Sequence, residues 1–340
     1  MMWSELLGHS AQRSWLESAV KQSRLASTFL MVGPDGVGKR TFARLVAKSM
    51  LCLRQTPGLM VPCGVCESCV QVDASTHPDL LLLEKSADAS SLSIDKLVGS
   101  KENRMREGLF YELHIKPFGG VRRVAIIDDA DTILDEAANS MLKTLEEPPL
   151  GSLVFLIGTN EQRQLATIRS RSQIVRFGRL DPSHVALLLL RNGILSDANE
   201  AGEVAAMADG SIGMATLLAD SELRKFRSEL HAMLAQRPMD FVGISKAMLA
   251  QSQSVGEEGS ARRTRMKLLF SFACDFYRKI LLDDSSLQAT TEISRVKLSM
   301  ATAARAMDSC LIAQSEVDRN LTPAGLLESW AAKQAELCQA

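Results

Sequence analysis

The sequence predicts an α/β fold with a parallel sheet in its first half and helices alone in its second half. Three observations support this: short apolar runs end at glycine or acidic residues, segments of helical periodicity separate these runs, and no further run of this kind follows residue 178. Strands that alternate with helices form parallel sheets with helices on both faces. We therefore expect a sheet domain over residues 1–178, followed by helical domains at 179–220 and 221–340.

Four apolar runs are the expected strands, and each is short enough to be a strand buried on both faces. They span residues 27–33, 79–84, 122–128 and 151–159. Residues 12–23 carry apolar side chains at helical spacing before the first run, and residues 42–49 continue as a helix after it. The segment 85–93, KSADASSLS, consists mainly of small residues and is expected to be a loop.

A helix is also expected between the third and fourth runs. Its apolar residues recur at i, i+3, i+4 and i+7, as on one face of a helix, and Pro148 ends it. These residues are Ala138, Met141, Leu142 and Leu145. The second half begins with two helical segments closed by glycines, 181–194 and 197–210, and continues with longer amphipathic helices such as 260–282 and 321–338.

The segment GPDGVGKRTFA, residues 33–43, follows the first run and has the spacing G-x-x-x-x-G-K. A glycine-rich turn between a strand and a helix directs backbone N–H groups at phosphate oxygens, and the lysine reaches the outer phosphates. The expected nucleotide-binding residues are Gly33, Gly36, Gly38, Lys39 and Thr41. Arg40 stands where such loops carry the hydroxyl that ligates magnesium, and Thr41 is one residue late. Because arginine cannot ligate a cation, binding of ATP with Mg2+ is expected to be weakened.

Two aspartates follow the third run. Asp128 stands at the carboxyl end of this expected strand, where sheets of this kind place a magnesium-binding carboxylate. Asp129 stands where many such ATPases carry the glutamate that positions the attacking water, and its side chain is one methylene shorter. A shift of about 1 Å can cost roughly a hundredfold in rate. The pattern therefore predicts a nucleotide site with impaired hydrolysis.

Four cysteines lie close together in LCLRQTPGLMVPCGVCESC. They are Cys52, Cys63, Cys66 and Cys69, and the last three form two overlapping C-x-x-C units. Such a set can wrap one tetrahedral Zn2+. All four ligands would be thiolates, which leaves no open coordination position, so the expected zinc site is structural. The remaining cysteines fall on helical patterns and are expected to be core or surface residues.

The composition narrows the class of protein. The chain carries 39 basic and 40 acidic residues, whereas a protein that binds nucleic acid alone usually has a basic excess. Contact with DNA is therefore expected to be shared with partners. No apolar run reaches the roughly eighteen residues that span a bilayer, and the first residues, MMWSELLGHS, do not read as a signal peptide. The chain is expected to be cytoplasmic, with no membrane contact.

Several motifs together resemble one protein family. They are NSMLKTLEEPP at 139–149, HPDL at 77–80, TIRSRSQIVRF at 167–177 and the cysteine module at 52–69, inserted after the helix that follows the glycine-rich loop. Over about residues 3–220 the chain resembles the clamp-loader subunits of bacterial DNA polymerase III. The resemblance implies an AAA+ P-loop domain at 1–178 with the zinc module inserted, a small helical lid at 179–220, and an all-α collar at 221–340 that joins subunits in a ring.

Within this family, the departures from the motifs favour the delta-prime branch over the ATP-hydrolysing gamma/tau branch. Arg40 replaces the magnesium hydroxyl, Asp129 replaces the catalytic glutamate, and Met214 stands where hydrolysing relatives carry a lid arginine. All three losses weaken hydrolysis and none weakens packing. The resemblance then implies gamma/tau and delta subunits as partners in a heteropentamer, and contact with the sliding clamp and primed DNA through that complex.

The resemblance also implies one retained catalytic residue. The family carries Ser-Arg-Cys where this chain has SRS, and its arginine reaches into the ATP site of the neighbouring subunit. Arg171 is by this correspondence the expected arginine finger, with Ser172 in place of the cysteine. Such a finger can raise the rate by about 10³–10⁵. Thr159 occupies the position at which the family reads the γ-phosphate, a role that the loss of the lid arginine weakens.

The expected function is therefore that of a delta-prime subunit, which supports ATP-dependent loading of the sliding clamp in DNA replication. We expect no robust ATPase of its own, and nucleotidyltransferase chemistry would belong to the polymerase holoenzyme that it serves. Two alternatives stay open: an ATP-hydrolysing gamma/tau-type subunit, and a zinc-dependent DNA-binding module. The second would bind DNA alone with a steep salt dependence, and the nearly balanced charge argues against it.

Overall fold

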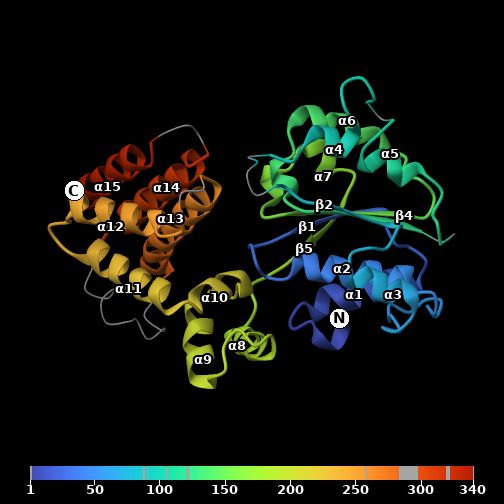
Figure 1. The fold of residues 1–340 in the computed structure, drawn as a ribbon, viewed down its shortest axis with the longest axis horizontal. Helices are drawn as coiled ribbons and strands as arrows, with labels where there is room; N and C mark the ends of the chain where they lie inside the picture. The colour runs from blue at the N-terminus through green and yellow to red at the C-terminus, as the bar shows by residue number, and fades with distance from the viewer. Residues whose placement is uncertain are drawn as a thin grey trace. The chain divides into compact units, whose positions relative to one another are not determined.

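The sheet of the first half contains five strands, all parallel, in the order β2-β3-β4-β1-β5 (Figure 1). Its strands are β1 (Thr28–Val32), β2 (Leu80–Leu83), β3 (Arg123–Ile127), β4 (Ser152–Gly158) and β5 (Gln173–Arg176). This computed structural model describes residues 2–86, 89, 91–104, 106–119, 122–256, 259–282, 298–318 and 322–339. The chain divides into two units, Met1–Ala219 and Asp220–Ala340. The predicted α/β class with a parallel sheet and a helical C-terminal part is confirmed.

Strand β5 was not among the expected strands. It pairs only with β1, at the edge of the sheet, and Gln173 and Arg176 at its two ends are exposed. An edge strand with one covered face needs no continuous apolar run. The signal that identified the other strands is therefore missing here. The central strand β1 shows the opposite pattern, because all five of its residues are buried.

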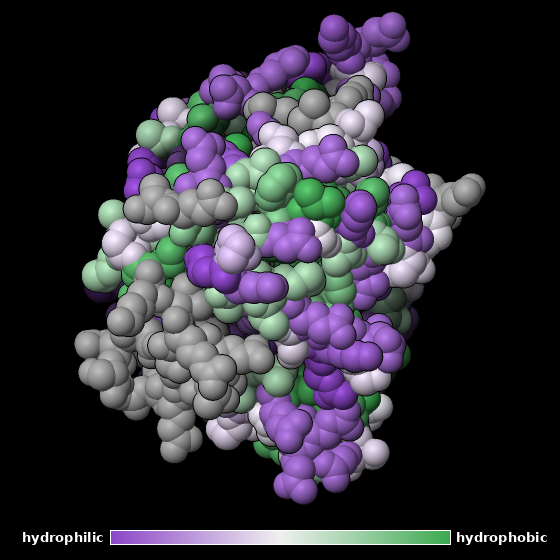
Figure 2. Space-filling view, turned by 90° about the vertical axis from the view of Figure 1, so that its left-hand side faces the viewer, coloured by the Kyte–Doolittle hydropathy of each residue, from purple (hydrophilic) through white to green (hydrophobic). Residues whose placement is uncertain are grey.

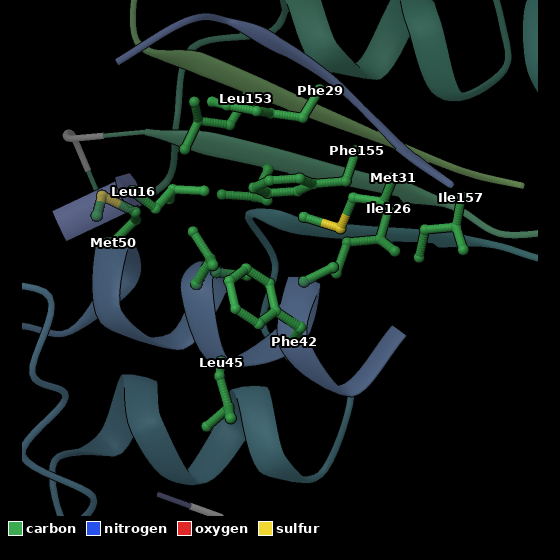
Figure 3. Close-up of a cluster of buried hydrophobic side chains, with 14 of the residues drawn as sticks. Leu16, Phe29, Met31, Phe42, Leu45, Met50, Ile126, Leu153, Phe155 and Ile157 are labelled. Carbon is green, nitrogen blue, oxygen red and sulfur yellow. The ribbon is translucent and has the colours of Figure 1, made fainter. Parts of the chain in front are cut away.

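Helices cover both faces of the sheet (Figure 1). One face carries α1 (Ser10–Lys21), α2 (Lys39–Leu51) and α3 (Glu67–Asp73), whereas the other carries α4 (Ile94–Val98), α5 (Leu109–His114), α6 (Asp135–Glu146) and α7 (Ala166–Arg169). Successive residues of β1 enter the two cores in turn, with Phe29 on the first face and Leu30 on the second. Figure 3 shows Phe42 of α2 pointing at the sheet, where Phe29 stacks on Phe155 with ring centroids 5.4 Å apart.

Three short helices complete the first unit: α8 (Pro182–Arg191), α9 (Ala198–Met207) and α10 (Ile212–Leu218). The start of α10 lies against the loop after β1, because the Ile212 amide donates to the Gly36 carbonyl at 2.9 Å. A Cβ on Gly36 would lie 2.3 Å from the Ser211 hydroxyl, so only glycine fits there. This contact makes α10 one wall of the cavity described below.

The second unit consists of α11 (Ser221–Ala235), α12 (Phe241–Gln253), α13 (Gly259–Leu282), α14 (Met300–Glu316) and α15 (Pro323–Gln339) over its described residues. Its core contains four fully buried aromatic side chains of α13: Phe270, Phe272, Phe276 and Tyr277. In the face shown by Figure 2, hydrophobic residues gather near the centre with hydrophilic residues around them. Within the described part of the chain, no helix has the length and apolar character to cross a membrane.

Candidate functional site

The glycine-rich loop lies where β1 ends and α2 begins, at the edge of the sheet where the parallel strands end. A cavity of about 500 Å3 opens there, and its lining comes from the ends of four strands or the residues that follow them, the start of α2 and the start of α10. Gly36, Gly38, Lys39 and Thr41 line it together with Asp128, Asp129 and Thr159. Of the residues predicted to bind nucleotide, only Gly33 is outside this lining; it packs against β5 instead, where a Cβ would lie 2.3 Å from the Phe177 carbonyl oxygen.

The ammonium group of Lys39 is turned back onto its own loop. Its Nζ donates to the carbonyl oxygens of Gly33 at 2.6 Å and Pro34 at 2.7 Å, and it lies 3.8 Å from the Asp35 carboxylate. The residue is 5% exposed, and this burial lowers the pKa of Lys39 from its ordinary value. The lysine is therefore poised at the base of the cavity with its charge satisfied by the loop.

Arg40 lies on the first turn of α2 and reaches across to the ends of β2 and β3. Its Nη1 forms an ion pair with Glu84 and lies 3.7 Å from Oδ2 of Asp128. Burial raises the pKa of Asp128, and Arg40 opposes this effect. The group expected here by the fold is a Mg2+ ion held by a hydroxyl after the lysine and by the strand-end carboxylate. The residues present do not fit it, because the hydroxyl is missing and a guanidinium faces the carboxylate.

Thr159, at the end of β4, is engaged within the protein. Both its amide, at 2.6 Å, and its hydroxyl donate to Oδ2 of Asp131, while Gln164 donates to Oδ1 of the same carboxylate at 2.7 Å. Asp131 thus receives three hydrogen bonds and holds the threonine hydroxyl. The sequence reading did not single out Asp131 or Arg163, although both line the cavity. The run of acids in DDAD was the only local signal for the first.

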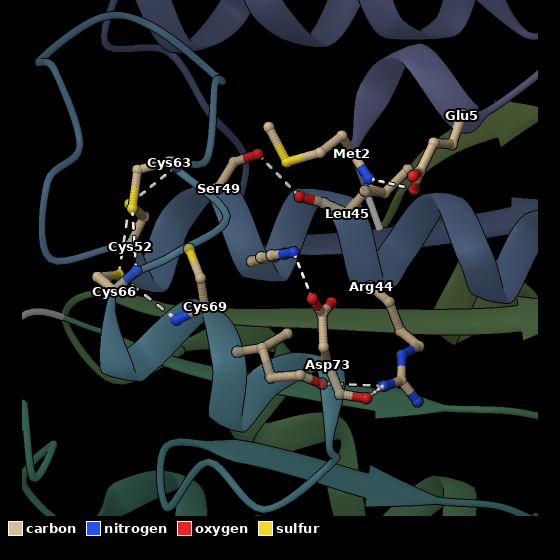
Figure 4. A network of polar contacts seen from close by, with 12 residues as sticks. Met2, Glu5, Arg44, Leu45, Ser49, Cys52, Cys63, Cys66, Cys69 and Asp73 are labelled. Carbon is tan, nitrogen blue, oxygen red and sulfur yellow. Dashed lines mark hydrogen bonds and ion pairs between the residues drawn. The ribbon is translucent and has the colours of Figure 1, made fainter.

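The four predicted zinc cysteines converge at the junction of α2 and α3 (Figure 4). Their sulfur atoms all lie within 4.8 Å of one another, and those of Cys52 and Cys66 are 3.9 Å apart. Tetrahedral Zn2+ with Zn–S bonds of about 2.3 Å separates its sulfurs by about 3.8 Å. Backbone N–H groups donate to three of the sulfurs, and such bonds from Val65 and Cys66 lower the pKa of Cys63 to about 6. The donor set and its spacing therefore fit Zn2+.

An ion pair between a buried lysine and a partly exposed aspartate holds the same two helices together. Lys48 of α2 is 1% exposed, and its Nζ lies 2.6 Å from Asp73 at the end of α3. Arg44, one turn earlier on α2, donates to the carbonyl oxygens of Val72 at 2.9 Å and Asp73 at 3.1 Å, as Figure 4 shows. The cysteine cluster and this pair fix α3 at its two ends.

Arg171 lies between α7 and β5, in the segment that leads to the edge strand. Its Nε donates to Glu146 of α6 at 2.8 Å, with a second bond from Nη2, and its Nη1 donates to the Thr167 carbonyl at 3.0 Å. Its side chain is 31% exposed. Arg171 is not among the described residues that line the cavity.

Comparison with known proteins places these features in a family. The family profile described as "DNA polymerase III, delta subunit" matches residues 8–181, just over half of the chain. DNA polymerase III subunit delta' of Pseudomonas aeruginosa is 27% identical over 281 residues, which cover 82% of this chain and 75% of that protein. The corresponding subunit of Bacillus subtilis is 34% identical over 179 residues, covering 53% and 50%.

A gamma/tau subunit is also similar. DNA polymerase III subunit gamma/tau of Mycobacterium bovis is 34% identical over 190 residues, which cover 56% of this chain but only 31% of that protein. The chain thus spans about half of the Bacillus delta' subunit and less than a third of this gamma/tau subunit. The matched family region includes the glycine-rich loop, the four cysteines and Arg171, and it ends before α8.

Proposed function

Because this chain belongs to the DNA polymerase III delta-subunit family, we propose that it acts as the delta-prime subunit of a clamp loader and supplies Arg171 to the ATP site of a neighbouring subunit. In this role it supports ATP-dependent loading of the sliding clamp during DNA replication. Its own nucleotide site contributes little or no hydrolysis. Polymerase chemistry belongs to the holoenzyme, not to this chain.

The position of Arg171 is the observation that carries this proposal. The guanidinium is fixed by Glu146 and by the Thr167 carbonyl, lies outside the cavity of its own chain and is still partly exposed. A fixed cation on the surface can stabilise the charge that spreads over a transferring phosphate in another subunit. The same side chain could do nothing for ATP bound to its own loop.

The residues around the chain's own cavity support weak hydrolysis. Arg40 faces the carboxylate that would ligate Mg2+, and the Thr159 hydroxyl already donates to Asp131. The side chain of Asp129 is one methylene shorter than that of glutamate, and the residue adopts a left-handed conformation, with φ of 54°. On α10, Met214 offers no charge to a phosphate. These four features all remove groups that hydrolysis needs.

Zn2+ is proposed as a structural cofactor at Cys52, Cys63, Cys66 and Cys69. Bound there, it would crosslink the end of α2 to the start of α3 and supply no chemistry, because no coordination position stays open. The proposed partners are the gamma/tau and delta subunits of a heteropentamer. The sliding clamp and primed DNA would be reached through this assembly. The second unit would form the collar, and α14 exposes three large apolar residues, Met300 at 71%, Leu311 at 46% and Ile312 at 52%.

Reconstitution with partner subunits tests the proposal. We expect Arg171→Ala to assemble normally, as judged by gel filtration, and to slow single-turnover hydrolysis at the adjoining ATP site by about 10³-fold or more. Clamp loading onto primed DNA would fall with it. Arg176→Ala is the matched control, because this arginine is on β5 nearby and is 69% exposed. Unchanged hydrolysis and loading in an intact Arg171→Ala complex would refute the finger.

The similarity to a gamma/tau subunit supports a second candidate function, that of an ATP-hydrolysing subunit. That candidate requires robust Mg2+-dependent turnover by the isolated chain. We expect the isolated chain to show none. Robust Mg2+-dependent turnover by the wild type, as fast as that of Arg40→Thr, would favour the gamma/tau-type subunit instead.

A further inference from the structure

The ion pairs of Arg40 join three elements around the place where a nucleotide-bound metal would lie. The guanidinium comes from α2, Glu84 follows β2 and Asp128 follows β3. Asp128 is the least exposed of the three side chains, at 25%. The arginine therefore covers the carboxylate on its cavity side, and Arg40 and Asp128 both line the cavity.

A divalent cation and this guanidinium compete for the same carboxylate. Mg2+ takes oxygen ligands at about 2.0–2.1 Å in octahedral geometry and keeps several waters. A guanidinium carries only donors and no lone pair for a metal. Mg2+ could reach Asp128 only by displacing a tethered cation, and the displaced charge would then repel it at short range. The geometry thus disfavours the metal while leaving a positive charge in its place.

The cavity can still receive phosphates. Its volume of about 500 Å3 is in the range of about 300–1,000 Å3 found for small-molecule sites. Gly36 and Gly38 of the loop have positive φ angles of 72° and 100°, and successive N–H groups in such turns can form a concave site for an anion. The lining carries four cationic side chains, Lys39, Arg40, Lys85 and Arg163, beside four carboxylates, Asp35, Asp128, Asp129 and Asp131. A polyphosphate would meet the start of the 13-residue helix α2 and these charges.

We infer that Arg40 takes the place of Mg2+, so that the cavity binds a nucleoside diphosphate or triphosphate in its metal-free form. The guanidinium would shift from Glu84 and Asp128 toward the phosphate oxygens, with which it can form paired hydrogen bonds. This inference rests on the proposed function in one respect, because a metal-free nucleotide suits a subunit that does not hydrolyse it. Arg40 would then determine whether the cavity takes the nucleotide with or without Mg2+.

Calorimetric titration of the isolated full-length chain with ADP tests this inference. We expect ADP to bind at least about tenfold more weakly in excess Mg2+ than in excess EDTA, because Mg2+ complexes ADP and removes the metal-free form that the cavity takes. In Arg40→Thr, the hydroxyl is restored and the competing charge is gone. ADP binding by this variant should be at least about tenfold tighter with Mg2+ than with EDTA.

Two controls make the result decisive. Lys39→Ala should lose ADP binding in both buffers, which would show that the heat comes from the glycine-rich loop. Circular dichroism and the melting temperature should show that each variant is folded. Binding by the wild type that is as tight or tighter in excess Mg2+ than in EDTA would overturn the inference, as would the absence of ADP binding in both buffers. Neither outcome affects the test of Arg171, which is read from hydrolysis in a neighbouring subunit.

Discussion

At the scale of single residues, the ion pair between Arg171 and Glu146 is not explained by its contribution to the stability of the fold. Both side chains are partly exposed, at 31% and 48%. Exposed pairs of this kind contribute about 0–1 kcal/mol to folding. The two bonds from Nε and Nη2 to one carboxylate oxygen instead restrict the orientation of the guanidinium. We therefore regard Glu146 as a positioning residue for the proposed finger.

Removing the charge of Glu146 should then affect catalysis more than folding. In the reconstituted complex, we expect Glu146→Gln to lower kcat for stimulated ATP hydrolysis by about tenfold, with KM unchanged, since only transition-state stabilisation is lost. The melting temperature of the isolated chain should move by no more than about 2 °C. Glu147→Gln is the matched control on the neighbouring exposed residue. Equal kcat for the two variants would show that Glu146 has no positioning role.

Residues that belong to a local sequence motif could be predicted. Residues whose contacts are with side chains far away in the sequence were missed. The glycine-rich loop, Asp128 and Thr159 all follow strands, so their convergence at one edge follows from the parallel sheet. Glu146 and Asp131 act on residues that are 25 and 28 positions away in the chain. No spacing rule links such pairs. The contact of Arg40 with Glu84, across 44 positions, was invisible for the same reason.

At the scale of elements, α3 shows how a short helix is maintained by its surroundings. It has seven residues, fewer than an isolated helix needs for stability in water. Cys66 caps its start by accepting from the Cys69 amide, and Asp73 near its end pairs with the buried Lys48. The proposed Zn2+ would add a covalent-like link from α2 to the first turn of α3. This helix should therefore depend on the metal.

Substitution of one cysteine tests this dependence. We expect the wild type to contain about one Zn2+ per chain by elemental analysis and Cys66→Ser to contain little or none, because three thiolates bind the ion far more weakly than four. The lost link should lower the melting temperature by about 5–10 °C. Cys274→Ser, outside the cluster, should retain both zinc and stability. A structural role for the metal would be contradicted if wild-type protein purified without zinc were as stable as the zinc-containing protein.

Length and apolar character together decide which elements the sequence could reveal, since β2 and β5 both have four residues and only β2, which is four leucines, was expected. The long helices α13 and α15 and the buried strands β1 and β4 repeat a hydrophobic period often enough to be recognised. Strand β5 and helices α3, α4, α5 and α10 have between four and seven residues each, so they complete no more than two turns or one alternation. Tertiary contacts stabilise these elements, for example the bond from Ile212 to the loop at Gly36. A pattern read along the chain cannot contain that information.

At the scale of the whole molecule, charged side chains set how the stability of the fold depends on pH. Several of these side chains lie close together in the second unit. Asp275 of α13 contacts Arg227, Arg278 and Lys279, with the last two at 2.7 Å and 3.4 Å. Burial would raise the pKa of Asp275, but these cations outweigh it and hold the pKa at about 2. The stabilisation from this carboxylate is present above about pH 4 and is lost only as the pH falls toward 2. It therefore does not contribute to changes in stability between pH 7 and 5.

His231 should instead change the stability of the fold between pH 7 and pH 5. Its ring is buried beside Arg227, its Nε2 lies 2.9 Å from the Phe272 carbonyl oxygen, and burial lowers its pKa to about 4. The unfolded chain binds the proton at a pKa of about 6.5. Stability is therefore complete above pH 6.5 and falls as the pH drops toward 4, by about 2 kcal/mol between pH 7 and 5.

His231→Gln isolates this contribution, because glutamine can donate to the same carbonyl and does not titrate. We expect the difference in unfolding free energy between wild type and variant, measured by urea denaturation, to change by about 2 kcal/mol from pH 7 to pH 5. His9 and His77, whose pKa values burial also lowers, occur in both proteins and cancel in this difference. Parallel profiles over this interval would mean that His231 takes up a proton in the folded chain as readily as in the unfolded chain. A charge there would lie against Arg227, and the buried pair between Arg227 and Asp275 could not then hold α11 to α13 in the arrangement described.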